Sequence, residues 1–196
     1  MGKIIYGNKN FGYAPITNSG GSYAFGTPVF LKGMVSASAD VEESKTNVYA
    51  DNQVYCVVSG TKTRNLTATL KYVSEAYAQF LGFKQEANGM LVDTNDKPHH
   101  CVFFETEEKD CETNDTTRTL HYFYDVVASQ PSLESTTMEE EIEAADLEVE
   151  YSAYDSSFVV DSDGKAVGYG KITRTEDNAT LYDSFITKVI LPTDAI

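Results

Sequence analysis

The amino-acid sequence predicts a mainly β fold, a β-sandwich or partly closed barrel with one short α-helix packed on one side. Most of the chain consists of short runs rich in β-branched and aromatic residues, separated by Gly, Asn and Asp turn signals. The aromatic residues are 13 Tyr and 10 Phe with no Trp, which favours strands. A single segment has a helical pattern, and one helix among many strands indicates a sheet with a helix along one side.

The first strands of the chain form a predicted hairpin. Residues 11–16 and 22–31 are β-rich, and Asn18-Ser19-Gly20-Gly21 stands between them. This connection contains the glycine that a backbone with positive φ requires. The two strands are therefore expected to pair across a tight turn.

Residues 54–59 and 63–72 carry the next strand signals, as two β-rich runs joined at Gly60. Polar and apolar residues alternate over positions 65–70. A period of two places every second side chain on the same face of a half-buried strand. The predicted buried residues of this strand are Leu66, Ala68 and Leu70.

The predicted helix follows directly. Ser74 is a suitable N-cap, Glu75 complements the positive N-terminal end of the helix dipole, and Gly82 is a natural stop. Tyr77, Phe80 and Leu81 fall on one apolar face at i, i+3 and i+4. A helix this short depends on packing against the sheet. Further strand signals occur at residues 101–104, 120–127, 146–153 and 181–191.

Two segments are predicted to be long polar loops. Residues 39–53 are poor in large apolar groups and too long for a tight hairpin connection, so we expect a loop that a partner orders. Residues 130–143 lead into an acidic region that contains seven carboxylates: Glu139, Glu140, Glu141, Glu143, Asp146, Glu148 and Glu150. The last three alternate with Ala145, Leu147 and Val149, which predicts a strand with an acidic exposed face.

Length and charge limit the possible functions. The chain has 196 residues, which fits a single domain, residues 1–196. Its 30 acidic and 15 basic residues give a formal net charge of −15, which argues against tight DNA binding. The charge is compatible with simple solubility or with a path along which DNA slides without sticking. No run approaches the roughly 18 apolar residues of a membrane span, and the N-terminus lacks a signal-peptide pattern, which indicates a cytoplasmic protein without a membrane partner.

No metal, cofactor or catalytic site is predicted. His99 and His100 are adjacent on a strand and point to opposite faces, and their spacing from Cys101 matches no zinc motif. Residues 161–164 lack the later ligands of a calcium loop and are expected to form a polar hairpin turn. The three cysteines, an odd number, are expected to be free thiols. No nucleophile motif is present, so the chain is predicted not to be an enzyme.

Several short motifs occur in a fixed order from about residue 8 to residue 192: Asn10-Phe11-Gly12-Tyr13-Ala14, Gly26-Thr27-Pro28-Val29, Asn47-Val48-Tyr49-Ala50-Asp51-Asn52, Glu86-Ala87-Asn88-Gly89-Met90-Leu91-Val92 and Tyr122-Phe123-Tyr124-Asp125-Val126. In this order they resemble the major tail proteins of siphophages, the long-tailed, non-contractile phages, especially those of Gram-positive bacteria.

The resemblance implies a structural protein of the virion tail that assembles in the bacterial host cytoplasm. Six copies would join into a ring, and stacked rings would form a hollow tube through which the phage DNA is ejected without specific binding. Its partners would be further copies of itself and the tape-measure, tail-terminator and distal tail proteins. The long loop and the chain ends would act as assembly arms. The loop residues expected to contact a neighbouring subunit are Val41, Glu42, Glu43, Val48, Tyr49, Asp51 and Asn52.

Two further expectations concern surfaces. The acidic residues from Glu139 to Glu150 are candidates for the lining of the tube. The alternative function is a baseplate or surface β-sandwich that binds a host polysaccharide, because exposed tyrosines can stack on sugars. The tyrosines considered for this role are Tyr49, Tyr55, Tyr151, Tyr154 and Tyr169.

Overall fold

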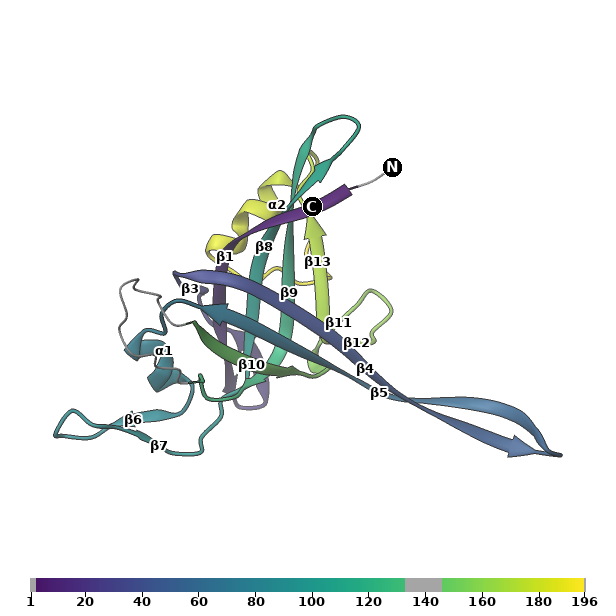
Figure 1. The fold of residues 1–196 in the computed structure, drawn as a ribbon, viewed down its shortest axis with the longest axis horizontal. Coiled ribbons are helices and arrows are strands. Elements are labelled where there is room, and N and C mark those ends of the chain that lie inside the picture. The colour runs from purple at the N-terminus through teal and green to yellow at the C-terminus, as the bar shows by residue number, and fades with distance from the viewer. Residues whose placement is uncertain (1–2, 133–145, 196) are drawn as a thin grey trace, which may run out of the picture.

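The computed structural model describes residues 3–132 and 146–195, and these residues are dominated by one antiparallel sheet (Figure 1). The strand order is β2-β1-β8-β9-β10-β5-β4, with β13 also paired to β9 and β3 to β1. The strands of this sheet are β1 (Lys3–Ser19), β2 (Ser22–Phe25), β3 (Val29–Phe30), β4 (Met34–Ala50), β5 (Gln53–Leu70), β8 (His100–Asp110), β9 (Thr116–Ala128), β10 (Leu147–Ala153) and β13 (Tyr169–Thr173).

Smaller elements complete the described part of the chain. Two short hairpins pair β6 (Phe83–Gln85) with β7 (Leu91–Asp93), and β11 (Ser156–Val160) with β12 (Ala166–Val167). The helical elements are α1 (Glu75–Phe80), α2 (Ala179–Asp183) and the 3-10 turn η1 (Ser184–Ile186). The predicted mainly β fold with a short helix is confirmed, and the large sheet is not closed into a barrel.

The predicted first hairpin is confirmed. Strands β1 and β2 pair from Ile16↔Phe25 to Ser19↔Ser22. Gly20 and Gly21 form the turn between them with φ of 62° and 91°. Such positive φ values cost little for glycine, so the sequence determines where this chain reversal occurs.

The first hydrophobic core lies on one face of the sheet, beneath α1. Leu66, Ala68 and Leu70 of β5 are fully buried there, as their alternation predicts. Tyr77 and Leu81 pack into this core from the helix side, and β8 and β9 contribute Val102, Phe104 and Phe123. The helix thus covers the apolar side of the sheet, and the sheet supplies the packing that so short a helix needs.

The two ends of α1 are as predicted. The hydroxyl of Ser74 accepts a hydrogen bond from the backbone N–H of Tyr77 at 3.2 Å, which satisfies one of the free donors at the helix start. Gly82 follows the helix with φ of 110°. A Cβ at Gly82 would lie 2.0 Å from the carbonyl oxygen of Asp96, so only glycine fits at this stop.

The second hydrophobic core lies on the opposite face of β8 and β9. Cys101 and Phe103 alternate with the residues of the first core, and the C-terminal segment covers them. Residues 181–191 were predicted to form a strand, and this prediction is wrong, because the segment begins as α2 and η1. Tyr182 and Phe185, at i and i+3, are buried from α2 and η1, and Val189 is buried in the segment after η1.

The predicted loop over residues 39–53 is also wrong in its conformation, since these residues belong to the long β4–β5 hairpin. The two strands pair from Met34↔Leu70 to Ala50↔Gln53. Asp51 and Asn52 form the two-residue turn with φ of 51° and 60°, the left-handed conformation that Asp and Asn tolerate. The two β-rich runs around Gly60 form one continuous strand, and Gly60 lies at an irregularity in its pairing with β4, where glycine is common.

A candidate assembly surface

The distal part of the β4–β5 hairpin extends away from the rest of the chain as an arm (Figure 1). We define the arm as residues 42–63. Strand β10 pairs with β5 only from Leu70 to Arg64, so beyond Arg64 the two strands of the hairpin have no other partner among the described residues. Both long edges of the arm therefore leave backbone N–H and C=O groups free to pair with another strand.

The arm carries apolar side chains on both of its faces. Cross-strand partners share a face, so the pairs in register assign Val48, Cys56 and Val58 to one face. Tyr49, Val54 and Val57 belong to the other. All six side chains are exposed. Among the residues that the structure describes, neither face of the arm has a core to pack on.

Tyr55 is the most exposed aromatic residue of the arm, with 78% of its surface accessible. It has no cross-strand partner, because Cys56 pairs with Val48 and Val54 pairs with Tyr49. Tyr55 is thus the extra residue of a β-bulge, a feature that often redirects a side chain at a functional surface. Tyr49 beside it is 67% exposed. The tip of the arm consequently presents two large aromatic rings to the surroundings.

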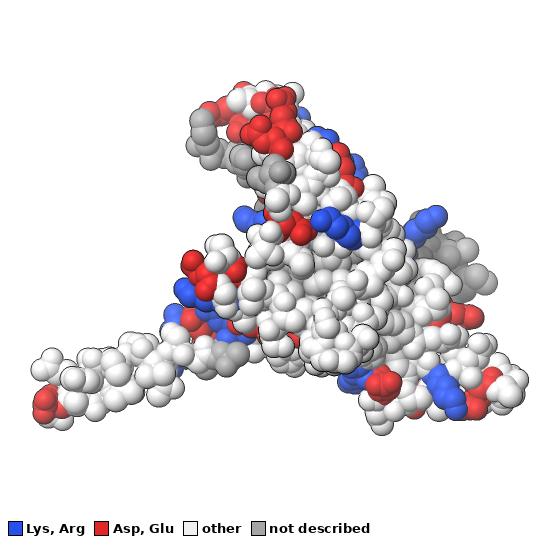
Figure 2. Space-filling view, turned by 180° about the vertical axis from the view of Figure 1, so that it is seen from behind, with Lys and Arg blue, Asp and Glu red and all other residues white. Residues whose placement is uncertain are grey.

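Charge divides the arm into a polar base and an almost uncharged distal part. At the base, Glu43 pairs with Lys45 at 3.2 Å and with Lys62 at 4.0 Å. From residue 46 to residue 61 the only charged side chain is that of Asp51 at the turn. Figure 2 shows the same division, an arm without blue or red along most of its length and with red at its tip. Solvated surface strands usually carry more charge, so the distal arm has the composition of an interface.

An isolated two-stranded hairpin is at best marginally stable in water. The cross-strand pairs of the arm contribute little stability. Its valines and tyrosines are exposed, so they do not contribute the burial energy that stabilises the rest of the sheet. Each such side chain contributes roughly 1.5–3 kcal/mol when it is fully buried. A second surface that covers the arm would therefore supply most of its stabilisation.

The structure places the predicted loop residues in two groups. Val41, Glu42 and Glu43 lie at the base of the arm, where Val41 pairs with Arg64, the last residue of β5 that also pairs with β10. The other four lie at its distal end: Val48, Tyr49, Asp51 and Asn52. All seven belong to one continuous hairpin, although the predicted conformation was a loop.

The predicted acidic face is described only in part. Glu139, Glu140, Glu141 and Glu143 lie outside the described residues. Glu148 and Glu150 are exposed on β10, and Val149 between them is buried. Asp146 forms an ion pair with Lys71 at 2.5 Å.

A further acidic surface, which sequence reasoning missed, lies at the far end of the β8–β9 hairpin. This end contains Glu107, Glu108, Asp110, Glu112 and Asp115, and Figure 2 shows it as a dense red area. Strand β1 runs along it from Lys3 to Asn8 and exposes Ile4 and Ile5. The sequence shows the run of carboxylates at residues 105–115. It does not show that β8 and β9 pair as a hairpin, and this pairing is what places the carboxylates at a projecting end.

The buried carboxylate of Glu105 has several structural partners. Glu105 is fully buried and accepts hydrogen bonds from Asn10 at 2.6 Å and from the hydroxyl of Tyr182 at 3.2 Å. Arg118 lies 3.4 Å from the same carboxylate. This carboxylate therefore connects β8 to β1, β9 and α2, which explains why a charged group is tolerated there.

The histidines and the buried cysteine show no catalytic arrangement. Burial lowers the pKa of His100 to about 4, so the ring is neutral, and its Nδ1 lies 2.9 Å from the carbonyl oxygen of Pro98. Burial raises the pKa of Cys101 well above its ordinary value, which makes the thiol unreactive. His99 was predicted to lie on the strand beside His100, but it precedes β8, where it is exposed and its Nδ1 lies 2.6 Å from the carboxylate of Asp125. No group of potential metal ligands occurs among the described residues.

The tyrosines considered for sugar stacking do not form one surface. Tyr151 is buried in the first core, where its hydroxyl lies 2.7 Å from that of Tyr77. Tyr169 is half-buried, and its hydroxyl lies 2.8 Å from Nδ1 of His121. Tyr49, Tyr55 and Tyr154 are exposed. The two tyrosines at the arm tip are the exposed pair that lies close together.

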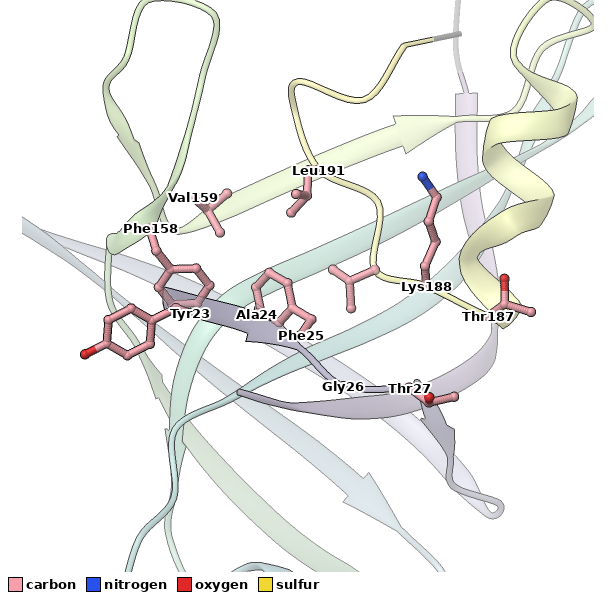
Figure 3. A pocket seen from close by; sticks show the side chains of 11 residues that line it. Tyr23, Ala24, Phe25, Gly26, Thr27, Phe158, Val159, Thr187, Lys188 and Leu191 are labelled. Atoms are coloured by element: carbon pink, nitrogen blue, oxygen red, sulfur yellow. The ribbon is translucent and has the colours of Figure 1, made fainter. Parts of the chain in front are cut away.

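An apolar groove lies beside β2 (Figure 3). It has a volume of about 350 Å³ and is formed by β2 and the following turn, by β11 and by the C-terminal segment after η1. Tyr23 stacks on Phe158 with ring centres 5.1 Å apart, and Phe25 lies 5.3 Å from the same ring. Lys188 is the one charged residue among those that line the groove.

Comparison with known proteins supports an assembly role. Residues 2–196 match a family model described as phage tail tube protein. No curated protein matches the chain. In the described ranges, no helix has the length and apolar character needed to cross a membrane. A tail tube is a structural part of the virion, which implies a non-enzymatic role. The chain therefore belongs to the phage tail tube protein family.

Proposed function

We propose that this chain polymerises into the hollow tail tube as stacked six-membered rings, and that the phage DNA passes through the lumen during ejection. The observation that carries this proposal is the arm, a two-stranded projection whose distal part has a single charged residue and apolar side chains on both faces. A tail tube protein associates with copies of itself, and the arm is a surface whose composition suits such a contact.

The arm offers two kinds of contact to a neighbouring subunit. Its free strand edges can extend a sheet of the neighbour through backbone hydrogen bonds. Its apolar faces can be buried at the same time. We assign the distal residues Val48, Tyr49, Asp51 and Asn52 to the contact itself. The base residues Val41, Glu42 and Glu43 set the direction in which the arm leaves the sheet.

The acidic surfaces suit a conduit that does not retain DNA. Phosphate groups are repelled by carboxylates, so an acidic lumen lets DNA slide without specific binding. Glu148 and Glu150 are exposed on β10, and the far end of the β8–β9 hairpin carries a second set of carboxylates. We propose that acidic side chains dominate the lumen, including those from Glu139 to Glu150. A density map of the tube with a basic lumen would contradict this assignment.

The same proposal implies further partners. A tube of defined length requires a tape-measure protein, and its two ends require a tail-terminator protein and a distal tail protein. We propose that assembly with these partners takes place in the host cytoplasm. No cofactor and no catalytic step is part of the proposal.

The proposal is tested by negative-stain electron microscopy of the purified chain over a range of concentrations, with the mass in solution measured in parallel. Hollow tubes or rings are expected, and six-fold rotational averages of the rings would establish the subunit number. Small discrete oligomers with measurable affinity for a host polysaccharide, and without polymer, would instead favour a baseplate or surface protein.

A further inference from the structure

We propose that the groove beside β2 receives the arm tip of a second copy of this chain. This inference rests on the proposed self-assembly and names the surface on the neighbour that completes the contact. The groove is defined by its lining residues: Tyr23, Ala24, Phe25, Gly26, Thr27, Phe158, Val159, Thr187, Lys188, Val189 and Leu191.

The lining of the groove suits an aromatic and aliphatic occupant. Its floor contains the stacked rings of Tyr23 and Phe158, with Phe25, Val159 and Leu191 around them (Figure 3). Tyr23 is itself exposed, although it is large and apolar over most of its surface. Aromatic rings gain about 0.5–1.5 kcal/mol from paired geometry in addition to area burial. Tyr49 and Tyr55 of an incoming arm could provide such partners.

The two surfaces also carry single charges of opposite sign. Asp51 provides the one negative charge at the arm tip, and Lys188 provides the one positive charge in the groove lining. Lys188 already donates to Asp194 at 3.0 Å, so Asp51 would share this cation with Asp194 and the expected gain is small. In Figure 3 the amine of Lys188 points away from the aromatic rings. The apolar and aromatic contact therefore carries the pairing of arm and groove, and the charges are compatible with it.

The arm cannot occupy the groove of its own chain. The arm contains the first part of β5. The last part of the same strand contributes Leu66, Ala68 and Leu70 to the first core. The groove residues Phe25, Phe158 and Val159 belong to the second core, on the opposite face of β8 and β9. Figure 1 shows the arm leaving the sheet and extending away from the rest of the chain. Both surfaces are thus left exposed in one chain, and a second copy can cover them.

Two different surfaces on each subunit make this a head-to-tail contact. A contact of this kind leaves one free arm and one free groove at the ends of every oligomer, so it propagates until a ring closes or a helical polymer grows. A symmetric contact of arm with arm would stop at a dimer. The proposed pairing of arm and groove therefore has the symmetry that rings and tubes require.

The test uses one variant with a defective arm and one with a defective groove. Tyr55→Glu places a charge on the apolar tip, and Tyr23→Glu places a carboxylate in the aromatic lining of the groove, where it also repels Asp51. Both positions are exposed, so the fold is expected to persist, which circular dichroism checks. The matched controls are Tyr23→Phe in the groove and Tyr72→Glu at an exposed tyrosine outside the arm.

Each defective variant alone is expected to sediment as a monomer of 21.6 kDa. The mixture is expected to form a 1:1 dimer and nothing larger, because the intact arm of Tyr23→Glu meets the intact groove of Tyr55→Glu. Both controls are expected to assemble as the unchanged chain does. A mixture that remains monomeric, or normal tubes from Tyr23→Glu alone, would overturn the proposal. Normal tubes from Tyr23→Glu would leave the tail-tube function itself intact.

Discussion

The two halves of β5 have the same conformation and opposite surroundings. From Arg64 to Leu70 the strand pairs with β4 on one side and β10 on the other, and its inward side chains are fully buried. From Gln53 to Thr63 it pairs with β4 alone and exposes three valines and Tyr55. The body half is stabilised within the chain. The arm half has the composition of a core strand, but the described residues provide no core for it to pack on.

The largest difference between the two halves should appear in truncations of apolar residues. Leu66→Ala in the body removes a fully buried side chain and is expected to lower the free energy of unfolding by about 2–5 kcal/mol. Val57→Ala in the arm removes an exposed side chain and is expected to change it by less than about 0.5 kcal/mol. Urea unfolding of the monomeric chain measures both values. A comparable loss from Val57→Ala would mean that the arm packs on its own body.

Acid should weaken the body through His100. Its folded pKa is about 4 against an ordinary value of 6.5, because burial penalises the charged ring. The unfolded chain therefore binds a proton that the folded chain does not, and stability falls as the pH drops from about 6.5 to about 4. The contribution is at most about 3 kcal/mol. His100→Leu is expected to flatten this part of the pH dependence in urea titrations at pH 7 and pH 4.5.

If the slope of stability against pH is the same in His100→Leu and in the unchanged chain, carboxylates elsewhere dominate the acid response. The arm contains no histidine. The pH effect should therefore reach assembly only through unfolding of the body.

The smallest expected effect concerns the ion pairs at the base of the arm. Glu43→Gln removes the partner of Lys45 and Lys62. Exposed ion pairs contribute roughly 0–1 kcal/mol, so the unfolding midpoint of the monomer should hardly move. We expect a change in assembly instead, as a dependence on salt that differs from that of the unchanged chain. Light scattering at low and high salt measures it, and identical salt profiles would show that the base does not direct the arm.

The parts of the fold that sequence reasoning predicted are those in which one face of an element is buried. Leu66, Ala68 and Leu70 alternate because one side of their strand faces a core, and the cap at Ser74 follows from local hydrogen bonding. The arm has no buried face, so its apolar residues show no clean alternation, and its sequence alone favours a loop. The arm is a hairpin because β4 and β5 pair along its length and Asp51-Asn52 forms a tight turn.

The C-terminal segment illustrates a different difficulty. Residues 181–191 are rich in β-branched and aromatic residues, and propensity alone favours a strand. Packing decides otherwise, because Tyr182, Phe185 and Val189 reach the second core together only from a helical start. The groove could not be predicted at all, since it combines residues of β2, β11 and the C-terminal segment, which lie far apart in the sequence.

The most direct test of the central claim is to remove the arm and retain the body. Residues 42–63 are replaced by Asn-Gly, so that the cross-strand pair Val41↔Arg64 closes on a two-residue turn. We predict a cooperatively unfolding monomer with the thermal stability of the unchanged chain. We also predict no rings or tubes in electron micrographs, under conditions in which the unchanged chain forms them. Tubes of normal length from the shortened chain would contradict the assignment of the arm as the assembly surface.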